Sequence, residues 1–111
     1  MPKKAALAFP RITKRDVARL IADISTNRSE LVFFSTHSQE RMLERGATNK
    51  QVFQVLRRGK VVRGPEWETN KDHGWKCLLC DISAGTKLNV AVKLIEKRPD
   101  DVVLVLTVFN V

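Results

Sequence analysis

The residues best suited to chemistry lie in one stretch, Ser35 to Gly46, where a histidine and two arginines are spaced four residues apart. His37, Arg41 and Arg45 fall at i, i+4 and i+8, so on a helix they would form one stripe about 12 Å long. Two arginines four residues apart on a helix repel each other. A helix selected only for stability would place opposite charges at such positions. A local rule broken in this way is typical of a functional site.

This stripe is suited to phosphoryl transfer on RNA. Thr36 has a glutamine three residues later, which is the spacing of a capping box and predicts that His37 is the first helical residue. A neutral imidazole can accept the proton of a ribose 2′-hydroxyl, and two guanidiniums beyond it can bind the scissile phosphate. The alternative is structural: His37 caps the helix or packs on the sheet, Arg41 pairs with Glu44, and Arg45 is solvated.

The elements that must position these residues change character halfway along the chain. Apolar residues at helical spacing predict helices in the first half, and runs joined by short turns predict an antiparallel meander in the second. The sequence therefore predicts an α+β fold with N-terminal helices packed on one face of an antiparallel sheet. We expect a basic, flexible arm at 1–12 and a single domain at 13–111. The expected helices are 14–25, 37–45 and 49–58, and the expected strands are 30–34, 60–63, 75–82, 87–96 and 102–109, with a loop at 64–74.

The stretch around His37 also carries a recurring motif, an aromatic residue followed by (Ser/Thr)-x-His-x-x-x-Arg-Met-x-x-Arg-Gly. It resembles an uncharacterised bacterial and phage domain family that is grouped with the RelE-like and MqsR-like RNase toxins of toxin–antitoxin systems. The chain departs from the family pattern at Ser38, where alanine is usual, and at Ala47, where a larger aliphatic residue is usual; both differences bear on packing. The motif is present here as Phe34-Ser35-x-His37-x-x-x-Arg41-Met42-x-x-Arg45-Gly46, followed by Val55-Leu56-x-x-Gly59-x-Val61.

The resemblance implies a RelE-like, microbial RNase-like fold and a metal-independent endoribonuclease that acts as an mRNA interferase. It also implies a cognate antitoxin protein as partner and RNA, including ribosome-associated mRNA, as substrate. In such toxins polar residues on the strands complete the active site, and the positions suggested here are Lys76 and Thr107. For Lys76 the alternative is a solvated lysine at a strand edge.

The charge of the chain favours a polyanionic partner. The formal net charge is +8, and residues 1–60 hold 13 basic and 5 acidic side chains, whereas residues 61–111 hold seven of each. Asymmetry of this kind indicates a surface for nucleic acid, although a basic surface can also serve solubility alone. We expect Arg57, Arg58 and Lys60 to bind RNA, and Trp67 either to stack on a base or to cover the core.

The two cysteines do not predict a metal site or a disulfide. Cys77 and Cys80 are three residues apart in an expected strand, so their side chains point to opposite faces and cannot chelate one ion with His37 and His73. We therefore expect no cofactor and no metal. The cysteine usage, and apolar runs too short for a membrane span, predict a cytoplasmic protein with no membrane partner.

Two other classes of function remain open beside the ribonuclease. The same basic face could serve a non-catalytic nucleic-acid-binding or regulatory module, or a protein-interaction module that meets an acidic partner. A small neighbouring gene for an acidic or helix-turn-helix protein would favour the toxin.

Overall fold

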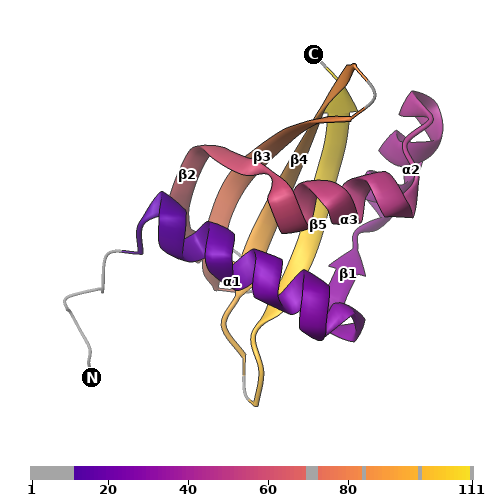
Figure 1. Ribbon diagram of the computed structural model, residues 1–111. Coiled ribbons are helices and arrows are strands. Elements are labelled where there is room, and N and C mark those ends of the chain that lie inside the picture. Colours follow the sequence, from indigo (N-terminus) through magenta and orange to yellow (C-terminus); the bar gives the residue numbers. More distant parts are fainter. Residues whose placement is uncertain (1–11, 70–72, 84, 98, 111) are drawn as a thin grey trace.

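The computed structural model describes residues 12–69, 73–83, 85–97 and 99–110. Within these ranges three α-helices pack against a five-stranded sheet, which confirms the predicted α+β class. Figure 1 shows α1 (Lys14–Asn27) and α3 (Asn49–Arg58) crossing one face of the sheet, with α2 (Thr36–Arg45) on the side of the last strand, β5 (Val102–Asn110). The expected N-terminal arm lies outside the described residues except for Ile12, which packs against the core. None of the described helices is long and apolar enough to cross a membrane.

Helices α1 (Lys14–Asn27) and α3 (Asn49–Arg58) begin where their capping signals predict. The Thr13 hydroxyl accepts a hydrogen bond from the backbone N–H of Asp16, whose carboxylate accepts one in return from the N–H of Thr13. These bonds from Thr13 hold the pKa of Asp16 below its usual value. Thr48 forms the same capping box with the residue three positions later.

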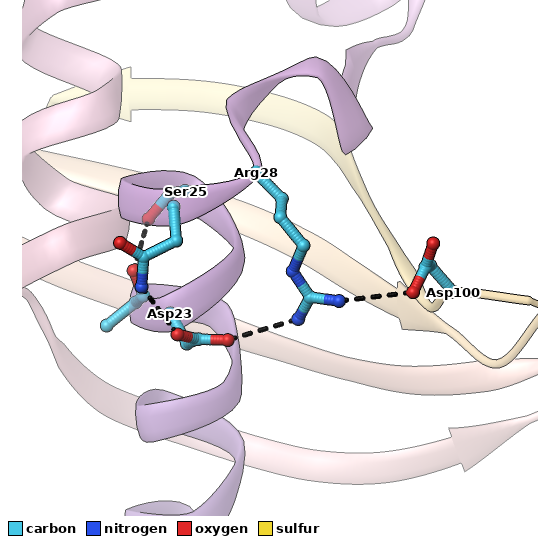
Figure 2. A network of polar contacts seen from close by, with 6 residues as sticks. Asp23, Ser25, Arg28 and Asp100 are labelled. Atoms are coloured by element: carbon cyan, nitrogen blue, oxygen red, sulfur yellow. Dashed lines mark hydrogen bonds and ion pairs between the residues drawn. The ribbon is translucent and has the colours of Figure 1, made fainter.

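The end of α1 is tied to the connection between the last two strands. The Arg28 guanidinium lies 3.0 Å from an Asp23 carboxylate oxygen and 3.3 Å from an Asp100 carboxylate oxygen. Figure 2 shows Arg28 reaching from the end of α1 to both carboxylates. Because Asp100 follows the fourth strand, this bridge joins the end of α1 to the connection between the last two strands.

The sheet is mixed rather than antiparallel, which corrects the expectation from the sequence. Its order is β1-β5-β4-β3-β2, and β1 pairs with β5 in parallel while the other pairs are antiparallel. The β1–β5 pairing joins residues about 70 positions apart, so no hairpin turn fixes its direction. The strands are β1 (Val32–Phe34), β2 (Lys60–Glu68), β3 (Gly74–Ser83), β4 (Thr86–Ile95) and β5 (Val102–Asn110).

The expected loop at 64–74 is largely strand, which is a second correction. β2 continues through Gly64 and Pro65 to Glu68, because register shifts on either side of Arg63 absorb these turn-forming residues as bulges. Proline is tolerated there because β2 is an edge strand and Pro65 lies within a register shift of the ladder.

The two faces of the sheet differ in composition. The face under α1 and α3 is the core, built mainly from valine, leucine and isoleucine of the helices and of β3, β4 and β5. The opposite face, which we call the outer face, is mixed in character and carries no helix among the described residues. Strand register places three rows of side chains on it: Thr107, Ala91, Leu78 and Arg63; Leu104, Lys93, Lys76 and Glu66; Phe109, Asn89, Cys80 and Lys60.

Candidate nucleic-acid interface

Helix α2 (Thr36–Arg45) begins one residue earlier than the capping-box pattern predicts. Its N-cap is Ser35, whose hydroxyl oxygen accepts a hydrogen bond from the N–H of Ser38 at 3.0 Å. The expectation that Thr36 is the N-cap is therefore wrong, and His37 is the second helical residue. The reason is tertiary: the Ser35 hydroxyl also donates to the carbonyl oxygen of Leu106 on β5, 3.1 Å away.

This contact places α2 along the part of β5 that β1 leaves unpaired. β1 pairs with β5 only as far as Val105, and the Ser35 N–H donates to the Val105 carbonyl oxygen at 3.0 Å. At the other end of α2, Arg45 and Asn110 line the same small depression. The helix therefore runs beside the second half of β5, with Ser38 and Met42 buried.

His37, Arg41 and Arg45, which we call the α2 stripe, lie on one side of this helix. His37 and Arg45 are exposed and Arg41 is partly buried. Arg41 forms an ion pair with Glu44, with 2.9 Å between Nη1 and Oε1, as the structural alternative expected. Among the described residues no hydrogen bond to the His37 imidazole and no ion pair to Arg45 is formed.

The two strand residues expected to complete the site both lie on the outer face. Thr107 pairs with Ala91 and follows Leu106, the residue that anchors Ser35, so it lies beside the beginning of α2. Lys76 lies on β3, an interior strand rather than an edge, and is about half exposed. Two strand spacings, about 10 Å, separate β3 from β5, so Lys76 is not adjacent to Thr107.

Lys76 belongs to a charged cluster that the sequence did not reveal. Lys76 and Lys93 lie directly opposite each other on β3 and β4, and Glu68 lies between their charges. One Glu68 oxygen is 3.0 Å from Lys93 Nζ, and the other is 3.8 Å from Lys76 Nζ. Lys93 is only 4% exposed, and its hydrogen bond to Glu68 holds the pKa of that carboxyl below its usual value.

The four residues expected to bind RNA are not gathered in one place. Arg57 donates from Nε and Nη2 to the Ser25 carbonyl oxygen, at 3.1 and 2.9 Å, and its guanidinium lies over the Phe53 ring. Arg57 therefore joins α3 to α1, whereas Arg58 is exposed at the end of α3. Lys60 is exposed on the outer face, at the start of β2.

Trp67 is a strand residue rather than a loop residue. Its register with Trp75 and Leu94 puts it on the core face, with 5.0 Å between the centroids of the two indole rings. The His73 ring contacts the Trp67 ring edge-on, with 6.1 Å between the ring centroids. Trp67 therefore lies on the opposite face from Lys76 and Thr107, in agreement with the alternative that it covers the core.

The cysteines lie on opposite faces of β3, as their spacing predicts. Cys77 is buried on the core face, where burial raises the pKa of its thiol to about 12. This thiol stays protonated at neutral pH and is a poor metal ligand or nucleophile. Cys80 pairs with Lys60 and Asn89 on the outer face. The described residues include no cluster of three or more metal-ligating side chains.

Sequence reasoning missed the residues that shape the outer face, above all Arg63, Ala91 and Phe109. Once β2 is known to be a strand, its pairing with β3 aligns Arg63 with Leu78, Ala91 and Thr107. Alternation along the last strand could not have located Phe109, because the bulge after Val105 moves Thr107 and Phe109 to the face opposite Val103 and Val105.

Comparison with known proteins identifies a domain family but adds no activity. A family model described as "Domain of unknown function (DUF4258)" matches residues 34–110. The matched region begins at the end of β1 and includes the whole α2 stripe and every strand of the meander, whereas α1 precedes it. No curated protein and no solved structure matches the chain.

Proposed function

The chain belongs to the DUF4258 family, and we propose that it is a metal-independent endoribonuclease whose site is the α2 stripe and the adjoining outer face. The observation that carries the proposal is an exposed histidine and two arginines on one side of a helix whose start is anchored to β5 beside Thr107. Such a surface offers one proton acceptor and two guanidinium groups that can bind phosphate, all on one helix beside an uncovered strand face.

The reaction would be an internal transfer at one phosphodiester. The His37 imidazole accepts the proton of a ribose 2′-hydroxyl as the 2′-oxygen forms a bond to phosphorus. The bond from phosphorus to the 5′-oxygen breaks, and that oxygen takes a proton from water or from the imidazolium. The products are a 2′,3′-cyclic phosphate and a free 5′-hydroxyl, so no oxygen atom from water is incorporated in this step.

The arginines would stabilise the charge that develops on the phosphate oxygens. Arg45 has no ion pair among the described side chains and can bind a phosphate directly. Arg41 must first exchange Glu44 for the phosphate, but an exposed pair of this kind contributes only about 0.2–1 kcal/mol. A bidentate bond to phosphate is stronger than that, so the ion pair orients Arg41 without blocking it.

The biological role we propose is that of a toxin in a toxin–antitoxin system. This part rests on the resemblance of the His37 motif to an uncharacterised domain family that is grouped with the RelE-like and MqsR-like toxins. Expression of the wild-type chain in bacterial cells should arrest growth, expression of His37→Ala should not, and a neighbouring acidic protein should relieve the arrest. Equal growth with both chains, at equal folded levels, would contradict the toxin role.

A non-catalytic RNA-binding role is the second candidate. A catalytic histidine is usually oriented by a third group, and no such hydrogen bond to His37 is formed by the described residues. On this alternative the α2 stripe would bind phosphates, and His37 would contribute no chemistry.

The direct test compares two substrates that differ in one atom. The purified chain is incubated in EDTA with a short single-stranded RNA and with the same oligonucleotide carrying a single 2′-deoxyribose at the site of cleavage. We expect the RNA to be cut to a 2′,3′-cyclic phosphate and the deoxy substrate to be bound but not cut. Cleavage of the deoxy position would exclude the mechanism, and binding without any cleavage would favour the second candidate.

A further inference from the structure

A hollow of about 270 Å³ lies on the outer face, away from the α2 stripe. We call it the sheet hollow, and its characteristic lining residues are Arg63, Glu66, Lys76, Leu78, Ala91 and Phe109. They come from four adjacent strands, β2, β3, β4 and β5. Its volume is just below the range of about 300–1,000 Å³ for small-ligand sites, which suits a single nucleotide rather than a large cofactor.

The irregular course of β2 forms one wall of the hollow. Register shifts lie on both sides of Arg63, and Gly64 adopts a left-handed φ of 87°. A Cβ at Gly64 would lie 2.5 Å from the Lys76 carbonyl oxygen, so only glycine allows the two backbones to approach this closely. Bulges of this kind redirect side chains and are frequent beside functional sites.

The floor of the hollow is apolar and includes one aromatic ring. Ala91 pairs with Leu78 on one side and Thr107 on the other, and its small side chain leaves the space open. Phe109 lies in the neighbouring row, is partly exposed and lines the hollow. A nucleobase can stack on such a ring whatever its sequence, because every base has a π face.

The rim provides positive charge. Arg63 is exposed, and no ion pair to it is formed by the residues that the structure describes. Lys76 is held loosely, because Glu68 lies 3.8 Å from Lys76 but 3.0 Å from Lys93. Arg63 can therefore bind an anion directly, and Lys76 can do so by giving up its longer contact with Glu68; among the lining residues, Glu66 is the one carboxylate.

The sheet hollow and the α2 stripe are joined by a single residue on β5. Thr107 pairs with Ala91 in the floor and follows Leu106, to which the start of α2 is anchored. The separation between β5 and β3 is about 10 Å, a distance that an extended strand of RNA can span within a few nucleotides.

We propose that the sheet hollow binds one nucleotide of single-stranded RNA next to the cleavage site. The base packs against Phe109, Ala91 and Leu78, and its phosphate binds Arg63 and Lys76. This inference rests on the proposed function and names the second contact point of the same substrate.

The test measures binding of a short oligouridine and of an abasic ribose–phosphate oligomer of the same length by fluorescence anisotropy at several salt concentrations. Phe109→Leu should weaken oligouridine binding about fivefold or more and leave abasic binding unchanged, because only the base stacks. Ala91→Leu, which fills the hollow, should act in the same direction. Arg63→Ala should reduce the magnitude of the slope of log K against log[salt] by about 0.7, which is the contribution of one phosphate contact on a single strand. Arg19→Ala is the matched control, since Arg19 is exposed on α1 and should leave that slope unchanged.

Each outcome has a defined meaning. If Phe109→Leu and Arg63→Ala melt like the wild type and bind oligouridine like the wild type, the sheet hollow is not a nucleotide site. If the wild type nevertheless cuts RNA in the cleavage test described above, the proposed function survives and only this inference fails. A wild type that binds neither oligomer would overturn both. If Ala91→Leu fails to fold, Phe109→Leu and Arg63→Ala still test whether the sheet hollow binds a nucleotide.

Discussion

Ser35 and Leu106 are joined by a hydrogen bond of 3.1 Å from the serine hydroxyl to the leucine carbonyl oxygen, across 71 positions of sequence. The same hydroxyl oxygen accepts the N–H of Ser38 and so caps α2. One side chain therefore sets both where α2 begins and where it lies on the sheet. The position of His37 relative to Thr107 depends on this contact.

The first prediction tests that anchor. Ser35→Ala removes the cap and the bond to Leu106 and should lower the free energy of unfolding by about 1–3 kcal/mol. Thr36→Ala, one residue along, should change it by less than about 0.5 kcal/mol, because Thr36 is exposed and is not the cap. Urea unfolding of both variants measures the difference, and a larger loss for Thr36→Ala would show that the cap is misassigned.

The second prediction separates two neighbouring arginines. Arg57→Met should destabilise the fold by about 1–2 kcal/mol, since Arg57 makes two hydrogen bonds to the Ser25 carbonyl oxygen between α3 and α1. Arg58→Met removes the same charge from an exposed position and should leave stability unchanged within about 0.5 kcal/mol. Equal melting temperatures for the two variants would contradict the role given to Arg57.

The third prediction concerns pH and the charged cluster on the outer face. Glu68→Gln leaves Lys76 and Lys93 facing each other without the carboxylate between them, so it should lower the melting temperature at pH 7. The pKa of Glu68 is lower in the folded state, so its stabilising contribution is present above its ordinary pKa of 4.5 and is lost as pH falls through the lower, folded value. The difference in melting temperature between the wild type and Glu68→Gln should therefore become smaller as the pH falls below 4.5.

Glu66→Gln is the control for that experiment. Glu66 is exposed and forms no ion pair within the described part of the chain, so its removal should leave the melting temperature nearly unchanged at every pH. A gap between wild type and Glu68→Gln that stays constant down to pH 2 would exclude the ionised Glu68 as its cause.

The fourth prediction concerns the ion pair on the α2 stripe. Glu44→Gln releases Arg41 and should raise RNA affinity about two- to fivefold, which corresponds to the worth of an exposed pair. Glu40→Gln makes the same change of charge on an exposed residue of the same helix and serves as the control. If both variants gain equally, the effect is one of net charge and Arg41 is not a specific phosphate ligand.

Local signals were sufficient to predict most elements from the sequence. The capping boxes at Thr13 and Thr48 are made by neighbouring residues, so their spacing alone locates the starts of α1 and α3. Gly46 ends α2 with a left-handed φ of 68°, as a glycine after a helical run predicts. The three strands of the meander also lie within about two residues of their expected bounds.

The features that could not be predicted all depend on contacts distant in sequence. Ser35 rather than Thr36 caps α2 because Leu106 holds the Ser35 hydroxyl, and β1 pairs with β5 across most of the chain. Gly64 and Pro65 are turn signals in isolation, but pairing with β3 makes them a bulge within β2. The α2 stripe was visible in the sequence because helical spacing is local, whereas the sheet hollow required the register of four strands.

The measurement that tests the central claim most directly is the cleavage rate of RNA by His37→Ala beside His73→Ala, the only other histidine in the chain. General acid–base catalysis by His37 predicts a rate about 10²- to 10⁴-fold lower for His37→Ala at saturating RNA, with affinity and melting temperature nearly unchanged. His73 contacts Trp67 on the other face of the sheet, so His73→Ala should cleave RNA at the rate of the wild type. A folded His37→Ala protein that cleaves as fast as the wild type would contradict the account.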